Sequence, residues 1–156
     1  MRRSVFLSAT LFALTMAACG GTTDPSGASI ESTTFAASLN VNLATMTRTA
    51  TGLYYRDLTA GTGTVATAGK TAKVHYQGWL PNGTKFDQNL APTAPFSFTL
   101  GSGQVVAGFD EGITGMKVGG VRQIIIPPAL GYGSRAAGSI PPNSILVFSV
   151  ELVTVQ

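Results

Sequence analysis

The stretch VHYQGWLPNGTKFDQN at residues 74–89 has the pattern of a β-hairpin. Its first half is rich in β-branched and aromatic residues, and Pro-Asn-Gly at 81–83 marks a point where the chain can reverse. Side chains alternate between the two faces of a strand, so Tyr76 shares a face with every second residue of the first half. Phe86 and Asp87 arrive on the returning half. The hairpin therefore predicts an aromatic pocket with a carboxylate at its edge.

The rest of the chain beyond Gly52 predicts more strands and one helix. Apolar runs separated by glycine, proline and asparagine are expected to form antiparallel strands at 53–58, 71–80, 96–100, 121–126 and 145–155. Residues 106–116 alone have helical spacing, with Phe109, Ile113 and Met116 on one face. This pattern predicts an α+β domain in which a twisted antiparallel β-sheet wraps around one short α-helix.

The first 18 residues have the features of a secretory signal peptide. Two arginines precede an apolar run, and small residues lead to Cys19. Residues 16–19, Met-Ala-Ala-Cys, resemble a bacterial lipobox, in which leucine is usual where Met16 stands. The resemblance implies cleavage before Cys19 and acylation of its new N-terminus. For a lone cysteine the alternatives are a small buried hydrophobe or a stray thiol, and the position of Cys19 outweighs both.

Residues 19–51 are expected to be the lipidated cysteine and a flexible tether, because Gly, Ser, Thr, Ala and Asn dominate them. Apolar side chains at helical spacing leave a short helix open within this segment: Phe35, Leu39, Leu43 and Met46. A linker that packs loosely on its own domain is favoured over a dimerisation or docking arm.

Composition removes several classes of function. The precursor carries a net charge of +3, and loss of Arg2 and Arg3 leaves eight basic side chains against seven acidic ones. No basic cluster remains, so a nucleic-acid partner is not expected. His75 is the only histidine and is expected on the face opposite Tyr76, which argues against a metal site or Cys-His catalysis. No serine sits in a Gly-x-Ser-x-Gly elbow, so a hydrolase is unsupported.

The hairpin resembles the opening hairpin of the FKBP-type peptidyl-prolyl cis-trans isomerases. Similar blocks follow in the family's order: PFSFTLG at 95–101, VVAGFDEG at 105–112, MKVGG at 116–120, IPPALGYG at 126–133, IPPN at 140–143 and LVFSVEL at 146–152. The resemblance covers residues 52–156 and implies an FKBP-type isomerase domain there. Rotation about an X-Pro bond breaks and forms no covalent bond, so no cofactor or metal is expected.

The resemblance also implies which residues bind substrate: Tyr76, Phe86, Asp87, Phe96, Val105, Val106, Phe109, Tyr132, Ile140 and Phe148. Asp87, Tyr76, Tyr132 and Phe148 are the implied catalytic residues among them. Asp87 would accept a hydrogen bond from the Tyr76 hydroxyl and bias the local field against the amide. Tyr132 would donate its hydroxyl to a substrate carbonyl, and the backbone N–H of Ile140 would anchor a second one.

Two departures and a core residue qualify these implications. Phe109, the implied floor of the pocket, stands where tryptophan is commonest in the family. The loop at residues 134–139 is one residue shorter than in the smallest well-known members. Substrate preference is therefore the family property that can least be carried over to this chain. Phe98 is assigned to the core.

The leading hypothesis is a lipid-anchored, extracytoplasmic isomerase acting on exported proteins. It would face the periplasm from the outer membrane if the source has two membranes. Its expected partners are proline-containing polypeptides, with macrolide inhibitors as candidate ligands, and the expected oligomeric state is a monomer. The alternatives are a non-catalytic binding module for a proline peptide or macrolide, and a holding chaperone. The short loop at 134–139 leaves no room for the inserted domain that many chaperone members carry.

Overall fold

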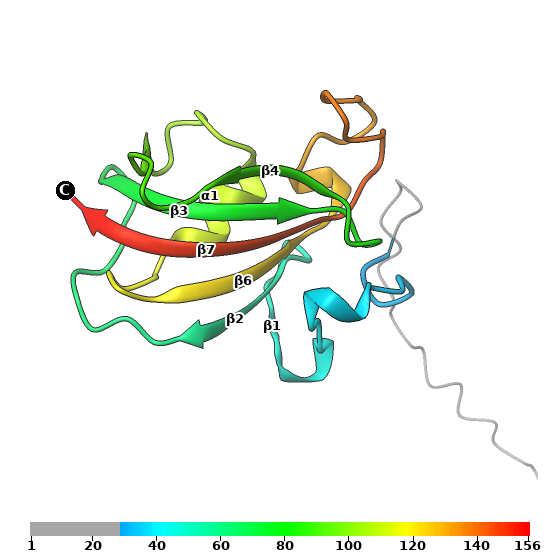
Figure 1. Ribbon diagram of the computed structural model, residues 1–156, viewed down its shortest axis with the longest axis horizontal. Helices are drawn as coiled ribbons and strands as arrows, with labels where there is room; N and C mark the ends of the chain where they lie inside the picture. The colour runs from blue at the N-terminus through cyan, green and yellow to red at the C-terminus, as the bar shows by residue number, and fades with distance from the viewer. Residues whose placement is uncertain (1–28) are drawn as a thin grey trace, which may run out of the picture.

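The computed structural model describes residues 29–156, so the predicted signal peptide and Cys19 lie outside the described residues. Within these residues, seven strands form one antiparallel sheet, and a single α-helix, α1 (Ala107–Ile113), lies against one face of it (Figure 1). The strands are β1 (Thr47–Arg48), β2 (Tyr54–Thr59), β3 (Thr71–Trp79), β4 (Lys85–Asn89), β5 (Phe96–Thr99), β6 (Val121–Ile126) and β7 (Leu146–Val155). The α+β prediction is confirmed. Within residues 29–156, no helix is long and apolar enough to cross a membrane.

The sheet has the order β1-β2-β6-β7-β3-β4, and β5 also pairs with β3. One edge of β3 pairs with β7 along its whole length, from Ala72 opposite Val155 to Trp79 opposite Val147. Its other edge is shared, because β5 pairs with the first half and β4 with the second. The hairpin predicted from the sequence is therefore present as β3 and β4, and β4 and β5 together form the edge of the sheet beyond β3.

Helix α1 is shorter than the helix predicted over 106–116, because Thr114 already leaves the helical conformation and Gly115 follows with φ +82°. Met116 is nonetheless buried beside the helix. Two helical glycines let α1 lie directly on β6. A Cβ at Gly108 would fall 2.3 Å from a methyl of Ile126, and one at Gly112 would fall 2.6 Å from Ile124. This close approach fixes the depth at which the helix presents its side chains to the sheet.

Residues 29–48, called the N-terminal segment below, pack against the face of the sheet opposite α1. The segment contains two short 3₁₀ turns, η1 (Ala37–Leu39) and η2 (Leu43–Thr45), and ends in β1. An α-helix does not form there, because Asn40 adopts a left-handed conformation with φ +48° and Asn42 is extended. The flexible tether predicted through residue 51 therefore does not describe residues 29–48, whose apolar side chains lie against the sheet.

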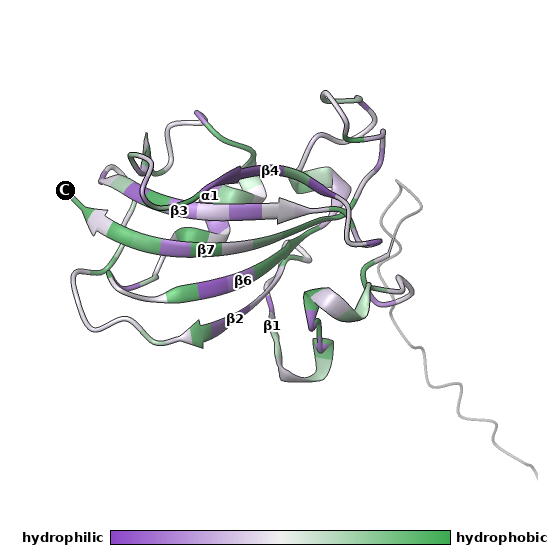
Figure 2. Ribbon diagram, in the orientation of Figure 1, coloured by the Kyte–Doolittle hydropathy of each residue, from purple (hydrophilic) through white to green (hydrophobic). Residues whose placement is uncertain are grey.

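The N-terminal segment covers an apolar area on that outer face. The buried side chains in this area form a cluster separate from the core under α1: Ile30, Leu39, Tyr54, Ile125, Ile145 and Val147. Along β6 a hydrophilic stretch near the start of the strand is followed by hydrophobic residues at its end (Figure 2). An apolar area of this kind needs a cover in water, and the N-terminal segment supplies it.

Candidate functional site

A cavity of about 670 Å³ opens between the β3–β4 hairpin, β5, α1 and the loop before β7. All ten substrate-binding residues expected from the sequence line it: Tyr76, Phe86, Asp87, Phe96, Val105, Val106, Phe109, Tyr132, Ile140 and Phe148. The fold thus brings together residues separated by up to 72 positions in the chain. Their roles in binding or turnover stay predictions.

Aromatic rings form the floor and walls of the cavity. Phe109 projects from α1 and is only 4% exposed, and its ring centroid lies 5.0 Å from that of Phe148 on β7. Tyr76 packs edge-on against Phe109 at 5.6 Å, and Phe86 packs edge-on against Phe148 at 5.5 Å. Edge-to-face pairs at these separations are favourable beyond their buried area, so the rings hold one another in place. The pocket floor is therefore a rigid apolar surface.

Gly78 of β3 leaves the space that two of these rings occupy. A Cβ built there would lie 2.7 Å from Cζ of Phe86 and 2.8 Å from Cε1 of Phe148. Any side chain at position 78 would push both rings, because real Cβ contacts do not come so close. The glycine in the hairpin motif thus has a packing role in shaping the pocket.

Asp87 lies at the exposed rim and is held by two hydrogen bonds. The Tyr76 hydroxyl donates to Oδ2 at 2.7 Å, and the backbone N–H of Gln88 donates to Oδ1 at 2.8 Å. Burial of the Tyr76 hydroxyl, and then its bond to Asp87, raise the pKa of Tyr76 well above the ordinary value of 10. Tyr76 therefore remains a neutral donor across the working range of pH, and the carboxylate keeps a fixed direction.

The loop between β5 and α1, which carries Val105 and Val106, is tied to its surroundings by two side chains. Oε1 of Gln104 accepts the backbone N–H of Thr99 at 2.8 Å. Oδ2 of Asp110 accepts the backbone N–H of Gly101 at 2.7 Å. These bonds connect the loop to the end of β5 and to α1, so the two valines are positioned from both sides.

The loop before β7 forms a tight turn at the mouth of the cavity. The N–H of Ile140 donates to the carbonyl of Ala137 at 2.9 Å, and the N–H of Ala137 donates to the carbonyl of Ile140 at 3.0 Å. In this conformation the Ile140 N–H is engaged within the turn, and its bond to a substrate carbonyl stays a prediction. Tyr132 is 41% exposed, so its hydroxyl is accessible from the mouth.

Four further residues line the cavity that sequence reasoning did not assign to it: Gln104, Ala137, Gly138 and Ser139. Gln104 directly precedes the two predicted valines, and this adjacency was the available signal. The other three belong to the short loop at 134–139, whose path through space no periodic sequence pattern encodes.

The chemistry of the lining is that of a binding surface for an uncharged group. Asp87 is the only charged side chain among the cavity-lining residues of the described chain. Within residues 29–156, no three His, Cys, Asp or Glu side chains gather closely enough to hold a metal ion. An apolar cleft with one oriented carboxylate can hold a ring-shaped apolar group and act on the polar bond beside it.

Comparison with known proteins agrees with this geometry. Residues 63–153 match the family model of the FKBP-type peptidyl-prolyl cis-trans isomerases. An FK506-binding protein of Neisseria meningitidis serogroup B is 52% identical over 105 residues, which are 67% of this chain and 96% of that protein. FK506-binding protein 1 of Dictyostelium discoideum is 50% identical over 95 residues, which cover 60% of this chain and 89% of that protein.

Solved structures show the same fold. The crystal structure of FkpA from Escherichia coli superposes with a TM-score of 0.66 at 39% identity, covering 72% of this chain and 52% of that one. The crystal structure of a peptidyl-prolyl cis-trans isomerase from Pseudomonas syringae pv. tomato gives the same TM-score at 34% identity, covering 77% and 86%. By family model, sequence and fold, the chain belongs to the FKBP-type peptidyl-prolyl cis-trans isomerase family.

Proposed function

We propose that this protein catalyses cis-trans isomerisation of X-Pro bonds in polypeptides. The observation that carries the proposal is the hydrogen bond from Tyr76 to Asp87 at the rim of an aromatic pocket. Membership of the family supports it, and so does the structural similarity to a protein described as a peptidyl-prolyl cis-trans isomerase.

The pocket lowers the barrier without covalent chemistry. Rotation about an amide costs roughly 18–20 kcal/mol, because resonance is lost when the bond is twisted. A proline ring seated on Phe109 and Phe148 leaves its amide at the rim, where water is partly excluded. The charge of Asp87 then acts on a carbonyl whose dipole changes direction during rotation. Interactions that are stronger for the twisted amide than for either planar form accelerate the reaction.

Turnover of a short Leu-Pro or Phe-Pro peptide by the folded protein tests the proposal directly. Asp87→Asn keeps the shape of the side chain and removes its charge, so kcat/KM should fall by about tenfold or more, as for other electrostatic groups at a reacting bond. Gln88→Ala is the matched control, because Gln88 is exposed on the same strand and does not line the cavity. A folded wild-type protein without acceleration, or equal effects of the two substitutions, would contradict the proposal.

A non-catalytic binding module is the second candidate, and Phe109 is the residue that favours it. It replaces the tryptophan that is commonest at this position, so the floor is deeper and has no indole N–H. Relatives of this chain carry the name FK506-binding protein, which states binding alone. FK506 titration beside the peptide assay separates the two functions, since tight binding with negligible turnover would favour the module.

We further propose that the domain acts on exported proteins from a membrane to which acylated Cys19 anchors it. The support is the pattern of residues 1–19, with its arginines, apolar run and lipobox-like end. Mass measurement of the N-terminal peptide from membrane-extracted protein tests this. A diacylglyceryl-modified Cys19 at the N-terminus is the expected result, and an uncleaved Met1 or an unmodified cysteine would contradict it.

A further inference from the structure

The N-terminal segment touches the turn of the hairpin that carries two pocket residues. The backbone N–H of Ala36 donates to the carbonyl of Pro81 at 2.8 Å. Pro81 begins the turn between β3 and β4, and Figure 1 shows the segment beside the tip of this hairpin. Phe86 and Asp87 lie on β4, a few residues beyond the turn. One hydrogen bond thus connects residues 29–48 to the hairpin at its free end.

The same segment also covers the back of the pocket. Trp79 and Val147 pack against it on the outer face of the sheet. Each is the chain neighbour of a pocket-side residue, because Gly78 precedes Trp79 and Phe148 follows Val147. Adjacent strand residues point to opposite faces, so a shift of either outer side chain moves the backbone beneath a pocket wall.

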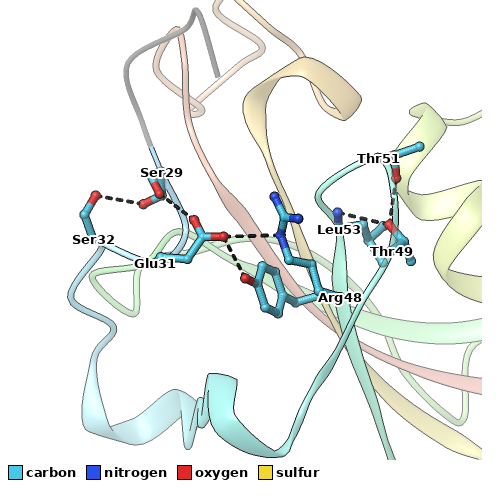
Figure 3. Close-up of polar contacts among 8 residues, drawn as sticks. Ser29, Glu31, Ser32, Arg48, Thr49, Thr51 and Leu53 are labelled. Atoms are coloured by element: carbon cyan, nitrogen blue, oxygen red, sulfur yellow. Dashed lines mark hydrogen bonds and ion pairs between the residues drawn. The ribbon is translucent and has the colours of Figure 1, made fainter. Parts of the chain in front are cut away.

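The segment is anchored to the sheet independently of the hairpin. Nε2 of Gln123, a buried side chain on β6, donates to the carbonyl of Leu39 at 2.7 Å. At its start, Glu31 accepts a hydrogen bond from the Tyr54 hydroxyl at 2.7 Å. Its carboxylate also pairs with Nε of Arg48 at 3.3 Å, and Figure 3 shows these two side chains facing each other. Bonds to β2 and β6 therefore fix the segment, and the fixed segment in turn holds the hairpin tip.

We propose that the N-terminal segment is a positioning element for the pocket. It holds the β3–β4 turn in place, and through the turn it sets where Phe86 and Asp87 stand relative to Phe148. The turn has few other restraints, since its own bonds are local: the Leu80 N–H donates to Thr84 and the Gly83 N–H to Leu80. The effect on turnover rests on the proposed isomerase function, whereas the effect on hairpin order and ligand binding does not.

Two alanine-to-proline variants isolate the contact. Ala36 has φ −58° and ψ 137°, which a proline adopts without strain, so Ala36→Pro deletes the donor to Pro81 and places ring atoms where the N–H was. Ala37→Pro is the matched control. Ala37 is exposed and is the first residue of η1, a position whose N–H lies outside the helical hydrogen-bond pattern and where proline is well tolerated.

Three readouts follow the hairpin in the full chain under conditions where every variant is folded. Amide exchange of Leu80 and Gly83 should be about fivefold faster in Ala36→Pro, the equilibrium effect of one ordinary hydrogen bond, and unchanged in Ala37→Pro. FK506 should bind about fivefold more weakly to Ala36→Pro alone. Trp79 is the only tryptophan of the chain, so its emission reports directly on the contact and should shift to longer wavelength in the same variant.

The coupling must also be reciprocal. Saturation of the wild-type protein with FK506 should slow exchange of the Ala36 amide by a similar factor, since a ligand that favours the ordered hairpin favours its contact with the segment. Equal exchange, emission and FK506 affinity in the two proline variants would overturn the proposal. If the wild type lacks isomerase activity while Ala36→Pro still loosens the hairpin and weakens FK506 binding, the proposed function fails and the positioning role stands.

Discussion

Gly78→Ala should destabilise the protein and narrow its pocket. The added Cβ would lie 2.7 and 2.8 Å from atoms of two phenylalanine rings. Carbon atoms pack favourably at about 3.5–4.0 Å, so at least one ring must move by roughly 0.8 Å. The backbone cannot move instead, because β3 is bonded to β7 on one side and to β4 on the other. Overpacking of this kind costs about 1–3 kcal/mol.

Urea denaturation at neutral pH measures the effect. With a slope of about 1.5 kcal/mol per molar urea, a loss of about 2 kcal/mol lowers the midpoint by about 1.3 M. FK506 affinity should fall as well, because Phe86 and Phe148 are displaced into the cavity that they line. A midpoint within about 0.3 M of wild type, an effect below 0.5 kcal/mol on the same slope, would refute the steric argument.

The double variant Gly78→Ala, Phe86→Leu identifies the clash itself. Leucine lacks the distal ring atom that lies 2.7 Å from the added Cβ, so it should relieve part of the strain. The two substitutions should then be non-additive, with a favourable coupling of about 1 kcal/mol in the unfolding free energies. Simple additivity would show that the cost of Gly78→Ala has another origin.

Three further predictions concern polar groups. Tyr76→Phe removes the hydrogen bond from the tyrosine hydroxyl to Asp87 and should lower kcat/KM severalfold. Because the pKa of Tyr76 is raised, wild-type activity should show no loss up to about pH 10 that comes from ionisation of Tyr76. A wild-type pH–rate profile that falls near neutrality, and that becomes flat in Tyr76→Phe, would contradict this. Hydrogen bonds from Ser29 and Tyr54 lower the pKa of Glu31 from 4.5 to about 2. The wild type should therefore be more stable than Glu31→Gln by a constant amount above about pH 4.5, and this advantage should disappear as the pH falls through 2. Thermal unfolding of both proteins at each pH measures the difference in stability, and a difference that grows on acidification would refute the prediction. Arg122→Leu leaves the carbonyls of Gly112 and Thr114, at the end of α1, without their donor and should cost about 2–4 kcal/mol in urea denaturation. An unchanged midpoint would show that water replaces the guanidinium.

Local patterns predicted much of this molecule correctly because they depend on few residues. The β3–β4 hairpin followed from the strand-like pattern of residues before a turn at which the chain reverses direction. The structure pairs Tyr76 with Asn89 and Gly78 with Asp87. The burial of Phe109 followed from the helical face that it shares with Ile113. The grouping of ten lining residues came from family resemblance rather than from spacing, since no local rule brings β5 and β7 to one cavity.

The N-terminal segment has the composition of a linker, and its local pattern does not reveal where on the domain it packs. Phe35, Leu39 and Leu43 stand four residues apart, a spacing that indicates a helix. The decisive information lies elsewhere in the chain. Ile125 and Val147 are apolar residues on the face of the sheet opposite α1, and they would be exposed to water if the N-terminal segment did not cover them. Their requirement for burial, rather than any helical propensity, orders the segment.

The position of β7 in the sheet has a consequence for how the protein is made. It is the last strand along the sequence, yet it lies between β6 and β3 and contributes Phe148 to the pocket. Until residues 146–155 have been synthesised, β3 and β6 lack the partner that joins them, and the two halves of the sheet cannot close. A nascent chain therefore stays open until β7 has been synthesised, and the non-local pairing that follows is intrinsically slow. Until β7 is in place the binding pocket does not exist, because Phe148 is one of its walls.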